Sequence, residues 1–146
     1  MIVIGCGKDK LDVPAKAREL YVGSLFRQAR RYAEATGEPW AILSAKHGIV
    51  CPDDVIEPYD VTLDGLDFSE LAKWAGRAAG LFCRRMRPVQ GDVVRVLAGV
   101  RYAHPFLTEL AERGVQGYQP LVGLGVGRRL GWLRREREQL GKGVRA

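Results

Sequence analysis

The sequence predicts an α/β fold, a three-layer sandwich in which a mostly parallel four-stranded sheet lies between helices. Short apolar runs that suit buried strands alternate along the chain with longer amphipathic segments that suit helices. Strands separated by helices usually pair in parallel and are covered by helices on both faces. The 146 residues, 47% of them hydrophobic, suffice for one well-packed domain. We therefore expect a single domain over residues 1–140 and a flexible tail over residues 141–146.

In the first part of the chain, two predicted strands flank an amphipathic helix. The run MIVIG at residues 1–5 ends in glycine, as a buried strand often does where it opens into a loop. The helix that follows is expected to begin at Ser24, which can cap its first turn, and to end at Gly37. Residues 40–43, with the sequence WAIL, form the second predicted strand.

The second part of the chain continues this alternation. A helix is expected from Ser69 to Met86, because apolar side chains recur along one of its faces. A short helix is expected near residues 102–114, with Pro105 in its first turn, where a proline removes no helical hydrogen bond. The remaining predicted elements are the third strand at residues 92–99, the fourth strand at 115–121 and an arginine-rich closing helix at 125–140.

Positive charge is concentrated in the second half of the chain. Residues 1–73 carry 9 lysines and arginines against 12 acidic residues, whereas residues 74–146 carry 14 against 5. Most of these cations are arginines, whose planar guanidinium can bind two phosphate oxygens at once. This distribution favours DNA as a partner, with Arg128, Arg129 and Arg134 of the closing helix as the predicted contacts. A solvated helix face in an arginine-rich protein is the alternative interpretation.

Targeting, cross-linking and metal-binding signals are not found in the sequence. No apolar run reaches the roughly 18 residues of a membrane span, and the first residues do not resemble a signal peptide. Cys6, Cys51 and Cys83 are odd in number and lack CxxC spacing, which predicts reduced thiols. The two histidines and the scattered acidic residues lack the spacing of a catalytic metal site. We expect a cytoplasmic protein without a metal or cofactor.

Polar clusters follow three of the four predicted strands. GCGKDK follows the first strand, SAKHG the second and AGVRY the third. Each cluster alone could be an ordinary turn or helix start, but the carboxyl ends of parallel strands meet at one edge of the sheet, where such proteins bind ligands. We therefore expect one ligand site at this edge. The residues predicted to bind the ligand are Cys6, Gly7, Lys8, Ser44, Lys46, Tyr59, Arg101 and Tyr102.

Several stretches carry resemblances to known families. A family of bacterial and phage proteins is similar to nearly the whole chain, through GCGKDK, LYVGSLFRQARRYAE, ILSAKHGIVCPDDVIEPYD, LAGVRY and PLVGLGVGRRLGWL. Residues 43–59 also resemble the YaaA family of peroxide-stress DNA-binding proteins and a domain of archaeal enzymes that remodel deazaguanine in transfer RNA. In its layout the chain is more distantly similar to the uracil-DNA glycosylase superfamily, although the usual motifs of that superfamily are absent. The last resemblance implies a uracil-DNA glycosylase-like fold and activity on a nucleobase.

The polar residues are suited to hydrolysis of an N-glycosidic bond. That reaction passes through a cationic sugar, so it needs a nearby carboxylate, a donor for the departing base and a held water molecule. By analogy with glycosylases that carry an aspartate in the loop after their first strand, Asp9 is expected to position the water or stabilise the sugar, while Asp60 orients the base. His47 or Lys46 is expected to donate to the departing base. Tyr59 and Tyr102 could stack on an extruded base. These features predict a metal-independent DNA glycosylase that excises a modified base.

Other activities remain open at this point. The resemblance to YaaA implies a DNA-binding module without catalysis, and the resemblance to the archaeal enzymes implies base modification in transfer RNA or free nucleotides. Cys6, between two glycines and near Lys8 and Lys10, could instead act as a nucleophile. If DNA is the partner, it could be single-stranded or modified.

Overall fold

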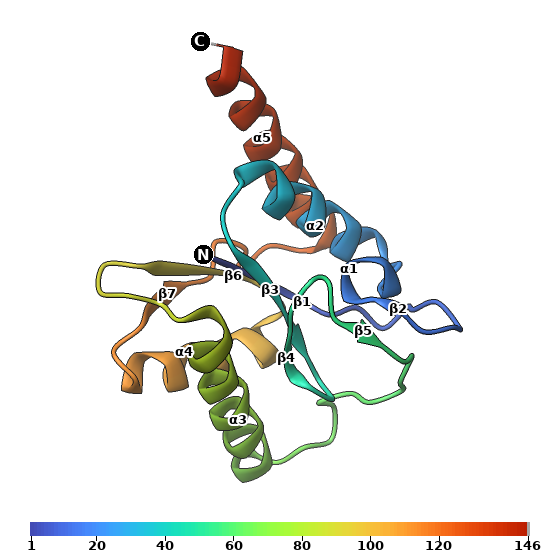
Figure 1. Ribbon diagram of the computed structural model, residues 1–146, viewed down its shortest axis with the longest axis vertical. Helices are drawn as coiled ribbons and strands as arrows, with labels where there is room; N and C mark the ends of the chain where they lie inside the picture. The colour runs from blue at the N-terminus through green and yellow to red at the C-terminus, as the bar shows by residue number, and fades with distance from the viewer. Residues whose placement is uncertain (146) are drawn as a thin grey trace.

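A five-stranded mixed sheet lies at the centre of the protein and is flanked by helices (Figure 1). The computed structural model describes the backbone of residues 1–145 and the side chains of residues 1–142. The strand order is β4-β3-β1-β6-β7, and all neighbouring strands are parallel except the β3–β4 pair. The α/β class and the mostly parallel sheet are thus confirmed. The strands are β1 (Ile2–Gly5), β3 (Trp40–Ser44), β4 (Gly48–Val50), β6 (Val93–Leu97) and β7 (Gln116–Tyr118).

The prediction of four strands was wrong by one, because β4 was interpreted as part of a loop. β4 pairs antiparallel with β3, and Ser44 lies opposite Gly48 with only three residues between them. Gly48 has a φ of 75°, a conformation that lets the chain reverse so tightly. A three-residue strand is too short for the alternation of apolar and polar residues that reveals longer strands.

Four long helices correspond to the four predicted ones, with differences at their ends. Gly37 ends α2 with a φ of 71°, as expected, but no side chain caps the start of this helix, so Ser24 does not act as its cap. Asp67 caps the start of helix α3, because its carboxylate accepts a hydrogen bond from the amide of Glu70. The four helices are α2 (Ser24–Thr36), α3 (Phe68–Met86), α4 (Val100–Glu112) and α5 (Val126–Arg145).

Helix α4 begins earlier than predicted, so Pro105 is its sixth residue and lies beyond the first turn. Because proline has no N–H, the carbonyl of Arg101, four residues before it, receives no helical hydrogen bond from it. Helix α5 reaches Arg145, past residue 140, where we expected the folded domain to end.

Two apolar layers form the core, one on each face of the sheet. Helices α3 and α4 cover one face, with Phe82 and Phe106 packed edge to face between them. Helices α2 and α5 cover the other face, where Tyr32 of α2 meets Trp132 of α5. Figure 1 shows these two pairs of helices on opposite sides of the sheet, with the C-terminal end of α5 projecting away from it.

A small ribbon is attached to one side of the sheet. The two-residue strands β2 (Ala15–Lys16) and β5 (Val55–Ile56) pair antiparallel, next to the single-turn helix α1 (Ala17–Leu20). Asp54 connects this ribbon to α3, because its carboxylate accepts two hydrogen bonds from Arg85. The hydrogen bond from Arg85 is the main reason why the pKa of Asp54 is lowered.

Replacing Arg85 with glutamine should reduce stability at neutral pH and leave it unchanged in strong acid. Because the pKa of Asp54 is lower in the folded protein, its pairing with Arg85 stabilises the fold above the unfolded pKa of about 3.9 and is lost as the pH falls through the folded pKa. Both side chains are partly exposed, so we expect a loss of less than about 1 kcal/mol at pH 7. Urea unfolding at several pH values checks this. Arg84→Gln, at an exposed neighbouring position, should show no such pH dependence.

No helix within residues 1–145 is long and apolar enough to cross a membrane. Cys6, Cys51 and Cys83 are all free thiols.

Candidate functional site

The candidate site is a cavity of about 510 Å³ at the carboxyl ends of β1 and β6. The chain passes from β1 to β3 on one side and returns to β6 on the other, so the strand order reverses between β1 and β6. Open α/β sheets bind their ligands at such a reversal, and the cavity volume is typical of small-molecule sites. The lining residues come from three segments. They are Gly5, Cys6, Gly7, Lys8 and Lys10; Asp60, Val61, Thr62 and Asp64; and Ala98, Gly99 and Tyr102.

Close backbone packing shapes the inner end of this cavity. Gly5 lies so near the β6–α4 connection that a Cβ atom added to it would stand 2.9 Å from the Cβ of Ala98. The amide of Cys6 donates to the carbonyl of Leu43, which extends the pairing of β1 and β3 by one residue. Cys6 is thereby held at the edge of the cavity by the sheet itself.

Lys10 stabilises the loop that follows β1. Its ammonium group donates to the carbonyls of Gly7 and Lys8, both at 3.1 Å. The same ammonium lies 4.4 Å from the centre of the Tyr59 ring, within the range of a cation–π interaction. Lys10 therefore links the loop after β1 to Tyr59, which does not itself line the cavity but directly precedes Asp60. The exposed Lys8 side chain is the cation more open to a ligand.

Ser44 and Tyr59 form a hydrogen-bonded network behind the cavity. Ser44 is fully buried, and its hydroxyl lies 2.7 Å from the Tyr59 hydroxyl and accepts from the amide of His47 at 3.0 Å. The Tyr59 hydroxyl also lies 2.6 Å from that of Tyr21. Burial raises the pKa of Tyr59, and it raises the pKa of Tyr21 to about 12, so both stay protonated. Ser44, predicted to bind the ligand, instead anchors the loop that contains Tyr59.

Disrupting this network should destabilise the protein. Ser44→Ala removes a buried hydroxyl and leaves the His47 amide and the Tyr59 hydroxyl each short of a partner, at a cost of about 1–3 kcal/mol. Because Tyr59→Phe breaks the same contact, the double variant should lose less than the sum of the single losses, by about 0.5 kcal/mol or more. Urea unfolding of the four proteins gives this coupling energy. Tyr118→Phe, on an exposed strand, is the control; strictly additive losses would contradict the network.

Asp60 and Asp9 do not occupy equivalent positions. Asp60 lines the cavity together with Asp64, which the sequence did not single out. Asp9 does not line it; it borders a more open neighbouring hollow, which Asp60 also borders. Of the two carboxylates predicted to be catalytic, only Asp60 therefore faces the cavity.

His47 lies outside the cavity. Its exposed imidazole ring packs edge-on against Tyr59, with the ring centres 5.4 Å apart. Partial burial is the main cause of its lowered pKa, and the charge of Lys46 lowers it further, which favours the neutral imidazole. The structure does not bring the predicted proton donor to the cavity.

Arg101 and Tyr102, neighbours on α4, have different roles. The guanidinium of Arg101 donates to the carbonyls of Leu63 and Leu66, each at 2.9 Å, and so holds the loop that forms one wall of the cavity. Tyr102 lines the cavity, and its ring packs edge-on against Trp74. Both residues were predicted to bind the ligand. Arg101 is instead engaged by loop carbonyls, whereas Tyr102 lines the cavity, where a ligand could contact it.

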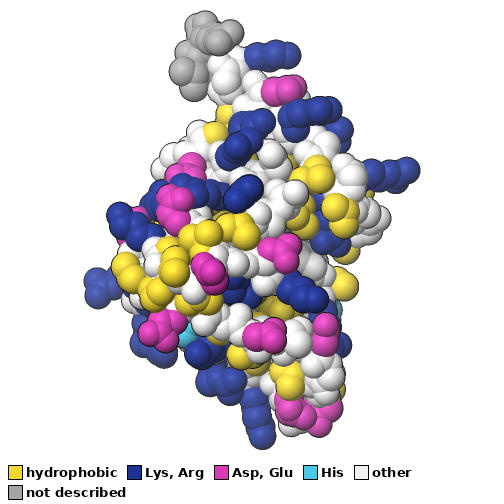
Figure 2. Space-filling view, turned by 90° about the vertical axis from the view of Figure 1, so that its right-hand side faces the viewer, with side chains coloured by type: hydrophobic (Ala, Val, Ile, Leu, Met, Phe, Trp, Pro, Cys, Tyr) yellow, Lys and Arg dark blue, Asp and Glu magenta, His cyan; other side chains and the backbone are white. Residues whose placement is uncertain are grey.

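The arginines of α5 also divide into two groups. Arg129 donates to the carbonyl of Leu124, and Arg137 donates to the side chain of Gln28 on α2. Arg128 and Arg134 are exposed, as is Arg135. Figure 2 shows lysine and arginine side chains spread over the upper part of the face in view, toward the C-terminal end of the chain. Of the three predicted DNA contacts, Arg128 and Arg134 remain open to a partner.

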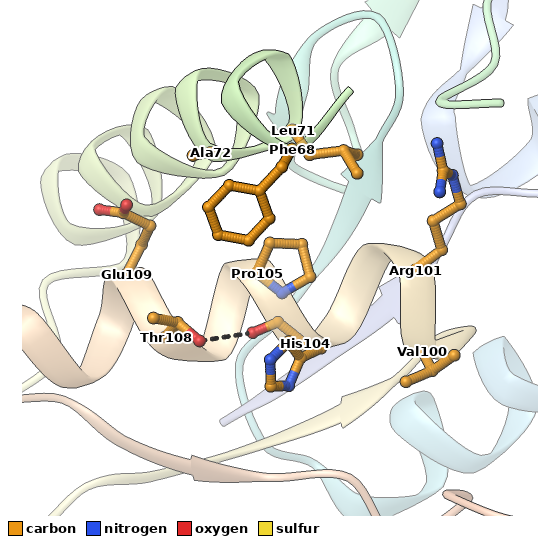
Figure 3. A pocket seen from close by; sticks show the side chains of 9 residues that line it. All are labelled: Phe68, Leu71, Ala72, Val100, Arg101, His104, Pro105, Thr108 and Glu109. Atoms are coloured by element: carbon orange, nitrogen blue, oxygen red, sulfur yellow. Dashed lines mark hydrogen bonds between the residues drawn. The ribbon is translucent and has the colours of Figure 1, made fainter. Parts of the chain in front are cut away.

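A separate groove of about 440 Å³ lies between α3 and α4 (Figure 3). Phe68, 88% exposed, stands at its edge, above Pro105 in the view of Figure 3. Two polar side chains of the groove are engaged by the protein. Thr108 donates to the carbonyl of His104, and Glu109 pairs with Arg113. Because the groove is apolar and holds few free polar groups, it is a weaker candidate for a ligand site than the cavity at β1 and β6.

The chemical groups around the cavity suit an organic ligand with polar edges. They include a thiol, two carboxylates, a hydroxyl from Thr62, an aromatic ring and the ammonium of Lys8. Within the described part of the chain, no group of three histidine, cysteine or acidic side chains is placed to hold a metal ion.

The fold and the cavity define an α/β protein with a candidate ligand site where its strand order reverses. The chain belongs to the family of unknown function DUF6884, whose model matches residues 1–135. It is also 41% identical over 69 residues to the uncharacterized protein YfjM of Bacillus subtilis (strain 168). This match covers 42% of the chain and 46% of YfjM, so the chain matches less than half of that relative's length. No solved structure matches the chain. The expected membership in a family that covers nearly the whole chain is confirmed.

Proposed function

We propose that the protein is a DNA glycosylase that binds a modified nucleobase in the cavity at β1 and β6. The observation that carries this proposal is that Asp60 and Tyr102 line the same cavity at the point where the strand order reverses. An aromatic ring can stack on an extruded base, and a carboxylate can stabilise the cationic sugar next to it. A cavity of about 510 Å³ has room for a base together with its sugar.

In the proposed reaction, the bond between the sugar C1′ atom and the base nitrogen breaks, and its electron pair leaves with the base. Asp60 stabilises the positive charge that develops on the sugar, and water then adds to C1′ and releases its proton to Asp60 or to solvent. The departing base takes a proton from Lys8 or from water, since His47 lies outside the cavity. This assignment gives Asp60 the role that the sequence suggested for Asp9.

The layout of the protein supports the proposal. Four parallel strands with polar loops at the carboxyl ends of β1 and β6 fit the resemblance to the uracil-DNA glycosylase superfamily. The exposed Arg128 and Arg134 could hold the DNA backbone, which would make affinity fall with salt.

A nucleic-acid-binding module without catalysis is the second candidate. It is favoured because Lys10 and Arg101 donate to loop carbonyls and because His47 is not in the cavity, which leaves few groups for chemistry. The resemblance of residues 43–59 to the YaaA family points the same way. Base modification in transfer RNA or in free nucleotides, suggested by the resemblance to the archaeal enzymes, would use the same cavity.

Product analysis separates these candidates. The protein is incubated with single-stranded and duplex oligonucleotides that carry unmodified, deaminated, methylated or hydroxymethylated bases, and the products are analysed by mass spectrometry. Free base together with alkali-labile abasic sites supports the glycosylase. Tight binding with unchanged oligonucleotide supports the module, and a base altered while still attached to its sugar supports the modifying enzyme.

A further inference from the structure

A second hollow, of about 370 Å³, lies directly beside the cavity. Val61 and Thr62 line both spaces, so a single stretch of loop separates them. The far side of the hollow is formed by α3, whose Trp74 donates its indole N–H to the carbonyl of Ser44 at the end of β3. This hydrogen bond fixes α3, and with it the hollow, relative to the strand ends around the cavity.

Three cations border this hollow. They are Lys46, which follows β3, and Lys73 and Arg77, which lie one turn apart on α3. All three side chains are exposed, and none is in an ion pair with the residues described here. Glu70 is the one acidic residue among those that line the hollow. The hollow thus has a net positive charge that the protein does not neutralise.

Several other arginines in the structure are neutralised by a carboxylate. Arg18, Arg30, Arg85, Arg95 and Arg113 each pair with a carboxylate. Like charges four residues apart on a helix, as at Lys73 and Arg77, destabilise it slightly. Bringing Lys46 toward the same space adds to the repulsion, which an anion bound between the three would relieve.

We infer that this hollow binds a phosphate group attached to the nucleoside whose base enters the cavity. The loop at Val61 and Thr62 would then lie between the base and the phosphate, with the cations of the hollow on one side and Asp60 on the other. Arginine and lysine are the usual protein partners of phosphate. The inference rests on the proposed binding of a nucleobase in the cavity, but it does not depend on catalysis there.

Binding measurements on α3 variants test the inference. Arg77→Gln and Lys73→Gln are compared with Arg84→Gln, which removes the same charge from the same helix but seven residues beyond Arg77 and away from the hollow. The probe is a fluorescein-labelled single-stranded oligonucleotide of mixed sequence, and its affinity is measured by anisotropy at several salt concentrations. Thermal unfolding checks that each variant remains folded.

Each lost phosphate contact should lower the slope of log affinity against log salt by about 0.7 and weaken binding about fivefold at 0.1 M salt. We therefore expect this change for Arg77→Gln and for Lys73→Gln, roughly twice the slope change for the double variant, and no change for Arg84→Gln. Equal effects at positions 77 and 84, or no effect at position 77, would overturn the inference.

A competition arm identifies the source of the phosphate. If a nucleoside monophosphate displaces the probe better than its nucleoside, and Arg77→Gln removes that advantage, the phosphate belongs to a single nucleotide. If only the oligonucleotide shows the Arg77 dependence, the phosphate belongs to a strand. Both results support the hollow as a phosphate site. Binding that depends on Arg77 without any release of base would refute the glycosylase and leave this inference standing.

Discussion

Asp60→Asn should slow base release in a single turnover by at least about 10²-fold, while affinity for the oligonucleotide is retained or increased. The substitution preserves size but removes the negative charge that faces the sugar in the proposed complex. Ground-state binding does not need this charge, and its removal reduces repulsion with the phosphates. A loss of rate without a loss of affinity indicates an interaction made in the transition state.

Asp9→Asn is the matched control for this prediction. It makes the same chemical change at an exposed carboxylate that does not line the cavity. Asp9 borders the open hollow near Pro58 and Tyr59, which is distinct from the proposed phosphate site. We expect its rate to remain within a few-fold of wild type. A slow Asp9→Asn together with a normal Asp60→Asn would restore the roles that the sequence alone suggested. If both variants were fully active, the N-glycosidase mechanism would have to be abandoned.

Gly48→Ala should reduce the free energy of unfolding by about 2–5 kcal/mol, because it combines backbone strain with a steric clash. Gly48 has a φ of 75°, which strains any other residue, and a Cβ atom there would stand 3.2 Å from the Cα of Ala78 on α3. The glycine of the SAKHG stretch is thus required by the tight turn into β4 and by the packing of α3 against it. Urea unfolding measures the loss.

Gly37→Ala separates the two causes. Gly37 has nearly the same φ, 71°, but nothing lies within 4 Å of its added Cβ atom. This variant should lose only the cost of strain, about 1–2 kcal/mol. If the two substitutions were equally destabilising, the contact between Gly48 and α3 would contribute nothing.

Much of the fold could be predicted because its elements are long or strongly patterned. Helices α2 and α3 have clear apolar faces, the strands β1 and β3 are buried apolar runs, and β6 is apolar except for Arg95. Short elements escaped prediction: β4 and the β2–β5 ribbon have too few residues for a recognisable period. The predicted start of α4 is too late because proline usually lies in the first turn of a helix, whereas Pro105 lies beyond it.

The site was predicted in part. The loops after β1 and β6 do meet at one cavity, as the positions of GCGKDK and AGVRY indicated. The loop after β3 does not contribute directly, because Ser44 points into the core and His47 lies outside the cavity. Its place is taken by residues 60–64, a stretch with no periodic pattern that Leu63 anchors in the core.

The sequence also could not distinguish arginines that bind a partner from arginines that hold the fold together. Arg101, Arg129 and Arg137 were indistinguishable from their neighbours until the structure showed them donating to carbonyl or amide oxygens. Lys73 and Arg77 reach the hollow beside Lys46 only because α3 packs against β4, which no local signal reveals.

The central claim, that a nucleobase occupies the cavity at β1 and β6, is tested most directly by the alkylation of cysteines. Cys6 lines the cavity, whereas Cys51 and Cys83 do not, and all three are half-buried free thiols. Their rates of reaction with iodoacetamide are measured by mass spectrometry, with and without a saturating single-stranded oligonucleotide. If a base enters the cavity, the oligonucleotide should slow alkylation of Cys6 several-fold and leave Cys51 and Cys83 unchanged. An unchanged rate at Cys6 while the oligonucleotide is bound would contradict the claim.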